Sequence, residues 1–225
     1  MGLSFRGLTQ EISPSVSKHL KTDSGHGLVM AWSWRGHGAV MARQAASGGS
    51  GLIRNKLFNP KGKRYALHHM LTDGKLGYGA WRDGGLTIHD ISDPTNPKLL
   101  SRLNWSPPFA GGTHTPLPLP GRQLAVVLDE ANAQKCAKGL FHSFVLDMRS
   151  PENPVPISTL PTPTDRDYCS FPGTFGPHNL HENRPGSFQS EELIFATYNN
   201  AGVRIFDIKN QFAPKEVAYW VPPVP

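Results

Sequence analysis

Short apolar runs alternate with polar, glycine- and proline-containing turns along most of this chain, and the alternation repeats three times. Each unit opens with five or six apolar-rich residues, which predicts a buried strand. An alternating strand follows, then a turn bounded by proline, which cannot continue a ladder, and then a final strand. One more extended stretch precedes each unit, at 65–71, 113–119 and 177–182. We therefore expect four strands per unit.

The three units share one register. Asp90, Asp147 and Asp207 each stand seven residues before a proline, and they follow one another at spacings of 57 and 60 residues. A β-sandwich also has many short strands but gives no reason to reuse one turn three times. The predicted fold is therefore all-β, with three recognisable four-stranded blades of an incomplete β-propeller. The blades span residues 61–103, 113–160 and 177–221.

The three aspartates resemble active carboxylates only if the repeat is ignored. Each occupies the position where a strand enters a turn, and there an Asp side chain accepts hydrogen bonds from backbone N–H groups of the turn. We expect this structural role for Asp90, Asp147 and Asp207.

Longer motifs extend the repeat. They are LTIHDISDP (86–94), NWSPPFAGGTHTPLPLP (104–120), VVLDEA (126–131), GPHNLHENRPGSFQS (176–190) and VRIFDIKN (203–210). These stretches resemble the LVIVD-repeat proteins, a bacterial β-propeller family, over about residues 64–225. Gln211 departs from the family pattern, which has a turn proline there.

The resemblance implies a closed ring, and propellers close with about four to eight blades. Three blades imply a truncated chain, an aberrant N-terminus or an assembly of several chains, and truncation is the preferred interpretation. Unclosed blade edges and faces predict self-association. Any other partner is an unidentified small molecule or protein.

The N-terminal segment, residues 1–60, matches no blade motif and is expected to be irregular. Residues 1–64 carry a net charge of +8, whereas the remainder carries −2. The segment lacks interleaved aromatic residues, so a solvated or poorly ordered arm is expected and a nucleic-acid partner is not. No apolar run approaches the roughly 18 residues of a membrane span, and no secretory signal is visible. The expected location is the cytoplasm, with no membrane partner.

The middle unit is longer than the others. Nineteen residues separate Leu124 from Ser143, where the other units have ten, which indicates a nine-residue insertion. Cys136 lies in this insertion, and Cys169 lies in the long approach to the third unit. Two cysteines do not make a disulfide scaffold. Free thiols are expected, with a disulfide or a pair of soft metal ligands as the alternatives.

Histidines stand at the start of the first strand in every unit, and in a propeller these strands line the central axis. His69, His114 and His178 align as equivalents, and His181 follows closely. Neutral imidazole suits transition metals, so these four are the candidate ligands of a divalent transition metal whose identity stays open. The alternative is a structural role, in which each ring bonds to backbone or water.

Other polar residues are expected at the same end of the ring, in the turns between the second and third strands. The candidate ligand-binding residues are Arg82, Asp83, Asn199 and Asn200, together with Trp105 as the wall of a pocket. Asp129 and Glu130 are the candidate catalytic residues, as a general base or as partners that orient a metal ligand.

These features favour a propeller that binds a metal through axial histidines. Hydrolysis and oxidation both suit such a site, and whether the protein is an enzyme stays open. The alternatives are a non-catalytic scaffold for a protein or small molecule, and a non-functional fragment of a longer propeller.

Overall fold

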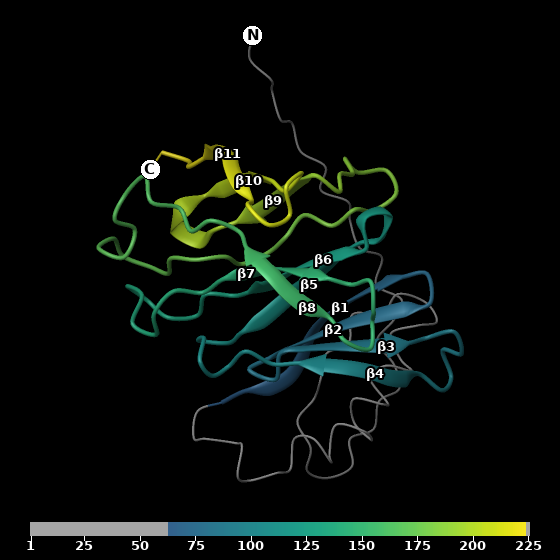
Figure 1. Ribbon diagram of the computed structural model, residues 1–225. Coiled ribbons are helices and arrows are strands. Elements are labelled where there is room, and N and C mark those ends of the chain that lie inside the picture. Colours follow the sequence, from purple (N-terminus) through teal and green to yellow (C-terminus); the bar gives the residue numbers. More distant parts are fainter. Residues whose placement is uncertain (1–62, 224–225) are drawn as a thin grey trace, which may run out of the picture.

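The computed structural model describes residues 63–223, so the segment predicted at 1–60 lies outside the described residues. Within 63–223 the structure is all-β. A strongly curled antiparallel sheet forms a half-barrel, consistent with an incomplete β-propeller (Figure 1). None of the helical segments in this range is long and apolar enough to cross a membrane.

The three predicted units form three blades of antiparallel strands. Blade 1 contains β1 (Tyr65–Asp73), β2 (Leu76–Arg82), β3 (Leu86–Asp90) and β4 (Lys98–Leu103). Blade 2 contains β5 (Thr113–Leu119), β6 (Leu124–Asp129), β7 (Ser143–Asp147) and β8 (Val155–Thr159). Blade 3 contains β9 (Leu193–Thr197), β10 (Val203–Asp207) and β11 (Lys215–Trp220). Two 3-10 turns lie at Pro120–Arg122 and Asn199–Ala201.

The first strand of blade 3 is shorter than the sequence predicts. Leu180 pairs with Ala196 as an isolated bridge, and the N–H of His178 donates to the carbonyl of Thr197 at 2.8 Å. The ladder ends where the chain turns away from β9 into the loop that precedes this strand. The side chain of Asn183 closes the loop through two hydrogen bonds to the backbone of Ser190. The predicted stretch at 177–182 therefore pairs as expected without forming a full strand.

Blades 1 and 2 belong to one eight-stranded sheet, in which Arg82 of β2 pairs with Thr113 of β5. Apolar side chains between the blades form two core clusters. The cluster between blades 1 and 2 includes Ile88 and Phe144, and the cluster between blades 2 and 3 includes Phe206. Burial of these side chains stabilises the curled arrangement, at about 1.5–3 kcal/mol for each large apolar side chain.

In blades 1 and 2, side chains at equivalent strand positions face the next blade. Tyr78 of β2 packs in the cluster between blades 1 and 2, and its counterpart Val126 of β6 packs between blades 2 and 3. The counterpart in β9 is Phe195, which pairs with Ile205. Within residues 63–223 no further blade covers this face of blade 3.

The repeated turn has the predicted structure in all three blades. The Oδ1 atoms of Asp90, Asp147 and Asp207 accept backbone hydrogen bonds from the residues two positions later, at 2.8, 3.0 and 2.7 Å. Side-chain hydrogen bonds from Ser92 and Arg149, together with these backbone bonds, hold the pKa of Asp90 and Asp147 below the usual range. The prediction of a structural role for the three carboxylates is confirmed.

The two cysteines form a disulfide, so the expectation of free thiols is wrong. The Cα atoms of Cys136 and Cys169 lie 5.5 Å apart, within the range a disulfide spans. The insertion of blade 2 folds against the approach to blade 3, where the N–H of Lys135 donates to the carbonyl of Gly173 at 3.0 Å. This contact between distant loops brings the cysteines together.

Candidate functional site

The strand register shows which histidines are equivalent. Met70, Pro116 and Leu180 pair with corresponding residues of the neighbouring strand in the three blades. The residue two positions earlier is a histidine each time: His68, His114 and His178.

The predicted alignment of His69 with His114 is therefore wrong by one residue. Register shifts occur between Tyr65 and His69 in β1 and between Thr113 and Thr115 in β5. A slip of one residue turns a side chain to the other face of a strand.

A second register position contributes to the same place. Leu76, Leu124 and Leu193 pair equivalently with the turn aspartates, and the residues six positions later are Arg82, Glu130 and Asn199. Each blade thus brings one histidine and one polar residue to this end of the sheet, as the strand directions predict.

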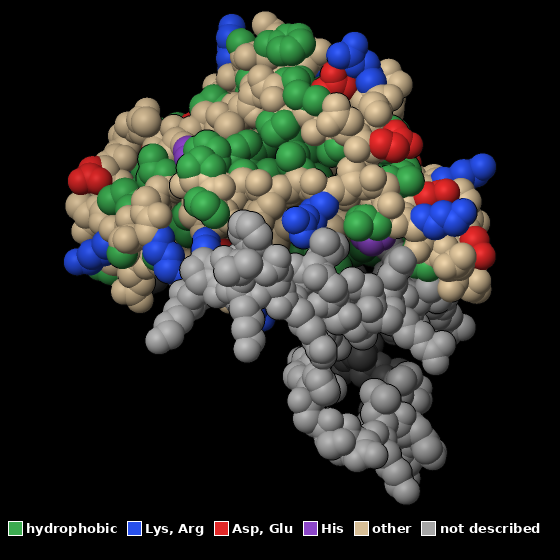
Figure 2. Space-filling model, turned by 60° about the horizontal axis from the view of Figure 1, so that its bottom comes forward, with side chains coloured by type: hydrophobic (Ala, Val, Ile, Leu, Met, Phe, Trp, Pro, Cys, Tyr) green, Lys and Arg blue, Asp and Glu red, His purple; other side chains and the backbone are tan. Residues whose placement is uncertain are grey.

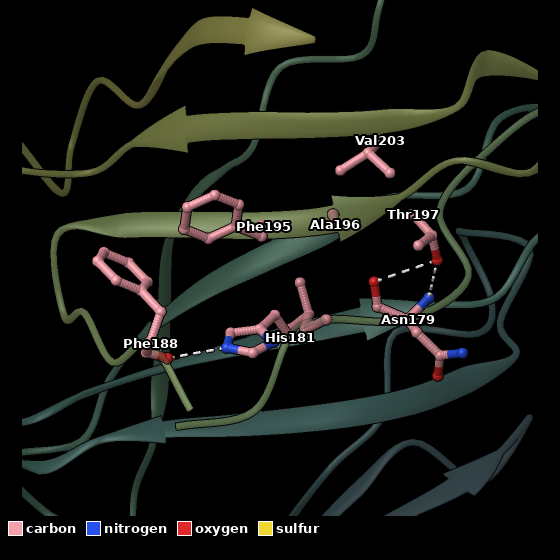
Figure 3. Close-up of a pocket in the computed structure, with 8 residues that line it drawn as sticks. Asn179, His181, Phe188, Phe195, Ala196, Thr197 and Val203 are labelled. Carbon is pink, nitrogen blue, oxygen red and sulfur yellow. Dashed lines mark hydrogen bonds between the residues drawn. The ribbon is translucent and has the colours of Figure 1, made fainter. Parts of the chain in front are cut away.

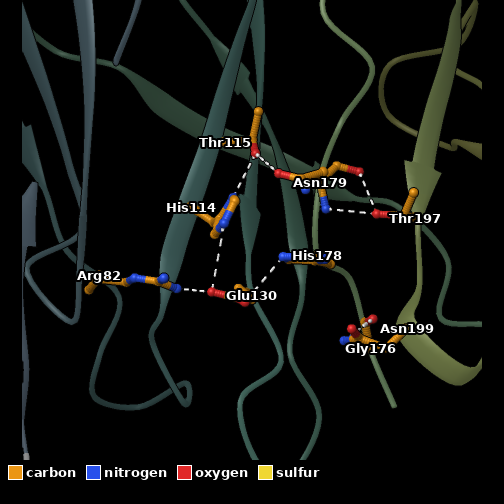
Figure 4. A network of polar contacts seen from close by, with 9 residues as sticks. All are labelled: Arg82, His114, Thr115, Glu130, Gly176, His178, Asn179, Thr197 and Asn199. Atoms are coloured by element: carbon orange, nitrogen blue, oxygen red, sulfur yellow. Dashed lines mark hydrogen bonds and ion pairs between the residues drawn. The ribbon is translucent and has the colours of Figure 1, made fainter. Parts of the chain in front are cut away.

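Glu130 lies at the centre of the resulting cluster, with Arg82, His114 and His178 directed toward it (Figure 4). Its Oε1 lies 3.3 Å from Nε2 of His178, and its Oε2 lies 3.7 Å from Nε2 of His114. Oε2 also accepts a close charged hydrogen bond from Nη1 of Arg82. One carboxylate therefore joins all three blades.

The rings of His68, His114 and His178 lie side by side next to Glu130. The ring centroids of His68 and His114 are 4.0 Å apart, and those of His114 and His178 are 5.2 Å apart. One nitrogen of His68, one nitrogen of His114 and a carboxylate oxygen of Glu130 all lie within 4.8 Å of one another. Among the described residues, His68, His114 and Glu130 therefore form a group that could hold a metal ion.

Burial and positive charge keep these rings neutral. Burial and the neighbouring His68 and Arg82 lower the pKa of His114 to about 2. Partial burial and Arg82 lower the pKa of His68 to about 4, and the same two causes lower that of His178. A neutral imidazole keeps a nitrogen lone pair, which metal coordination requires.

The hydrogen bonds around His114 favour one tautomer. The hydroxyl of Thr115 lies 3.4 Å from Oδ1 of Asn179, to which it can donate, and 2.9 Å from Nδ1 of His114, from which it can then accept. In that tautomer Nε2 is unprotonated and faces Glu130. Fixing a ring through its other nitrogen is the usual arrangement around metal-binding histidines.

His69 and His181 lie outside this cluster. Nε2 of His69 contacts Oε1 of Glu182 at 3.0 Å. Burial acts to raise the pKa of Glu182, but its contacts with His69 and Arg184 outweigh burial and lower it. Nε2 of His181 lies 2.8 Å from the carbonyl oxygen of Phe188.

The ring of His181 instead lines a hollow of about 430 Å³ on blade 3 (Figure 3). Phe188, Phe195 and Val203 supply apolar side chains to this hollow, and Asn179 and Thr197 supply polar groups. The hollow lies on the blade face that no further blade covers in 63–223.

Asp129 points away from the histidines, although it precedes Glu130. Its oxygens accept hydrogen bonds from Nε1 of Trp105 at 2.7 Å and from the hydroxyl of Thr113 at 2.8 Å. Burial raises the pKa of Asp129 to about 7. Neighbouring strand residues face opposite sides, so only Glu130 reaches the cluster.

Trp105 is buried between blades 1 and 2, with its ring centroid 4.5 Å from that of Phe144. It belongs to the core in this structure. The other predicted ligand-binding residues form hydrogen bonds with backbone groups. Asp83 accepts from the N–H of Arg64 at 2.6 Å, and the amides of Asn199 and Asn200 donate to backbone carbonyls. Arg82 alone among these residues contacts Glu130.

The sequence analysis did not select His68, which stands directly before His69 in the sequence. The register of the second strand identifies it. Gly79 and Val127 are equivalent, and they pair with Met70 and Pro116. The histidines two residues before these partners are therefore equivalent as well.

Comparison with known families agrees with the repeat. Residues 73–104 match the family model described as LVIVD repeat. The chain contains an LVIVD repeat. The match covers the end of β1 and strands β2, β3 and β4, which are most of blade 1. No curated protein matches the chain.

Proposed function

We propose that this LVIVD-repeat protein binds a divalent transition metal ion at His68, His114 and Glu130, with His178 as a neighbouring ligand. The observation that carries the proposal is the approach of one nitrogen from each of two histidines and one carboxylate oxygen to within 4.8 Å of one another. Imidazole and carboxylate together are typical ligands of zinc and related metals.

The separations between the ligand atoms support this proposal. Metal–ligand bonds of about 2.0–2.2 Å in a tetrahedral site place two ligand atoms about 3.3–3.6 Å apart. The distances from Glu130 to Nε2 of His178 and of His114 are 3.3 and 3.7 Å. Small movements of the side chains suffice to bring them onto one ion.

The charges of the groups support it as well. Nε2 of His114 and the carboxylate of Glu130 are both hydrogen-bond acceptors, and two acceptors that face each other repel. A cation between them converts this repulsion into attraction. Arg82 balances the charge of Glu130 from one side but does not contact Nε2 of His114 through any hydrogen bond.

Calorimetric titration of metal-free protein with Zn²⁺ or Co²⁺, followed by elemental analysis, tests the proposal. We expect one ion per chain. His114→Ala and Glu130→Gln should each lower the affinity at least about tenfold, since each removes a ligand atom. His181→Ala is the matched control and should bind as the wild type does. Folded protein that binds no stoichiometric metal, or equal affinity in all four proteins, contradicts the proposal.

A second candidate function rests on the hollow of blade 3. Its size falls in the range of small-molecule pockets, and its lining is mainly apolar and aromatic. A non-catalytic scaffold would bind an apolar small molecule there. Fluorescence of an apolar dye with wild type and Phe188→Ser tests this function, which needs dye binding that the substitution weakens and that added metal does not change.

A further inference from the structure

Arg82 has donor groups that its ion pair with Glu130 does not use. Its Nη1 bonds to Glu130, whereas its Nε is buried and has no hydrogen-bond partner. A guanidinium carries five N–H donors in a planar fork, which matches two oxygens of a carboxylate or phosphate. A buried donor without a partner is costly, so its retention at a candidate site is informative.

The backbone holds this guanidinium in place. Arg82 pairs with Tyr65 of β1 and with Thr113 of β5, where blades 1 and 2 meet. Its φ of +54° lies in the left-handed region, which non-glycine residues rarely adopt. Its side chain is only 13% exposed. Arg82 is therefore a fixed group, unlike a mobile surface arginine.

The cluster gains a net positive charge when a metal binds. Without metal, the charge of Arg82 balances that of Glu130. A divalent ion adds two positive charges in a place where Arg82 is already largely removed from water. Positive charges that are partly buried need compensation, and an anion on the metal supplies it.

The cluster is open to a small ligand on one side. His68 is exposed, and the side chain of His178 is 41% exposed. Glu130 and Arg82 are less exposed and lie deeper. An anion that enters past the two exposed rings would reach the metal and Arg82 together, because Arg82 and the ligand set share Glu130.

From this arrangement we propose that the metal-loaded site binds a small oxyanion, a carboxylate or phosphate group, between the metal and the guanidinium of Arg82. The inference rests on the proposed metal site and names the chemical class of its ligand. Arg82 acts here as a binding residue that selects for negative charge.

Cobalt provides a test, because its visible absorption changes when its coordination changes. Full-length protein loaded with Co²⁺ is titrated with inorganic phosphate, acetate and, as the uncharged comparison, acetamide. We expect phosphate or acetate to change the spectrum and acetamide to leave it unchanged. Tighter binding of phosphate identifies the ligand group as a phosphate, and tighter binding of acetate identifies it as a carboxylate.

Variants separate the role of Arg82 from that of charge in general. Arg82→Gln should weaken anion binding at least tenfold, and Arg82→Lys, which keeps the charge without the fork, should lie between. Arg149→Gln is the control, because Arg149 is an exposed arginine paired with Asp147 in blade 2. Circular dichroism checks that each variant is folded.

The outcomes distinguish the two proposals. A chain that binds no Co²⁺ overturns both the metal site and the anion site. A chain that binds Co²⁺ keeps the metal site, and the anion proposal then fails if no anion changes the spectrum. It fails equally if folded Arg82→Gln and Arg82→Lys bind the anion as tightly as Arg149→Gln does.

Discussion

Nε2 of His178 lies 3.3 Å from Oε1 of Glu130, although the two residues belong to different blades. Glu130 opens the insertion of blade 2, and His178 ends the approach to blade 3. The N–H of Ala131, next to Glu130, donates to the carbonyl of Pro177, next to His178, at 2.8 Å. The contact at the site is thus fixed by the pairing of two loops.

The disulfide between Cys136 and Cys169 joins these same loops. We expect replacement of both cysteines by serine to lower the free energy of unfolding by about 3 kcal/mol, because the bond closes a loop of 33 residues in the unfolded chain. Metal affinity should fall several-fold as well, since His178 and Glu130 lose their common support. Urea denaturation and calorimetric metal titration measure the two effects.

Reduction of the wild type should reproduce both effects, and the double serine variant should not respond to the reductant. A reduced wild type of unchanged stability would contradict this account of the bond. Disulfides persist in oxidising compartments, so the bond does not favour the predicted cytoplasmic location. Thiol labelling of protein made in an oxidising and in a reducing compartment shows where the bond forms.

Asp129 should make stability depend on pH in a direction unusual for a carboxylate. Burial raises its pKa from 3.8 to about 7, so between these values the folded chain holds a proton that the unfolded chain releases. The free energy of unfolding therefore falls as the pH rises through this window and the contribution is constant above it.

Asp129→Asn removes this titration. Relative to the wild type, the variant should gain on the order of 4 kcal/mol between pH 4 and pH 8. The lowered pKa values of His68 and His114 act in the opposite sense as the pH falls below about 6.5, so the two proteins are compared at each pH. Urea denaturation at each pH gives the difference, and parallel curves would contradict the raised pKa.

Gly85 should tolerate no side chain. Its φ is +80°, and a Cβ atom there would lie 2.2 Å from the carbonyl oxygen of Leu103. Gly202 occupies the same place in blade 3, where the oxygen of Trp220 would also lie at 2.2 Å. Each change to alanine should cost at least about 3 kcal/mol, the sum of strain at positive φ and a backbone clash.

Gly139→Ala separates the two contributions. Gly139 also has a φ of +80°, but a Cβ atom there meets nothing within 4 Å. It should cost only about 1 kcal/mol, from backbone strain alone. Thermal unfolding of the three variants measures these costs. Similar losses in all three would mean that the repeated close contact of Gly85 and Gly202 does not constrain the blades.

The fold could be predicted from the sequence because its signals are local and repeated. The Asp-to-Pro register of Asp90, Asp147 and Asp207 marks one turn three times, and each carboxylate bonds to its own turn. The short first strand of blade 3 was not predictable in the same way. Its end depends on a loop that Asn183 closes, and the repeat does not contain that loop.

The site was predictable in part. Strand direction placed the histidines and the turn residues at one end of the blades, where Arg82 and Glu130 do meet. The choice of His69 instead of His68 failed because His69 lies one residue before Met70, whereas His114 lies two residues before the equivalent Pro116. Free thiols were predicted instead of a disulfide because only the folded chain brings the two loops together.

Within residues 63–223, one face of blade 3 is not covered by a further blade. Exposed hydrophobic side chains are common on the described molecule, and Figure 2 shows a group of them in the middle of one face with charged side chains toward its margins. On blade 3, Phe188 and Trp220 are 60% and 63% exposed, and Trp220 pairs with Val203 of the hollow. The equivalent faces of blades 1 and 2 are each covered by the next blade.

We expect this face to pair with a second copy of the chain, since an apolar sheet face and its edge readily associate. Phe188→Ser and Trp220→Ser together should reduce the self-association measured by light scattering during gel filtration. Phe212→Ser is the matched control, because Phe212 is 67% exposed but lies in the turn between β10 and β11. A wild type that stays monodisperse and monomeric at high concentration would show that the face needs no second copy to cover it. Equal loss of self-association in the control would show that exposed aromatic side chains in general cause the effect, and not this face of blade 3.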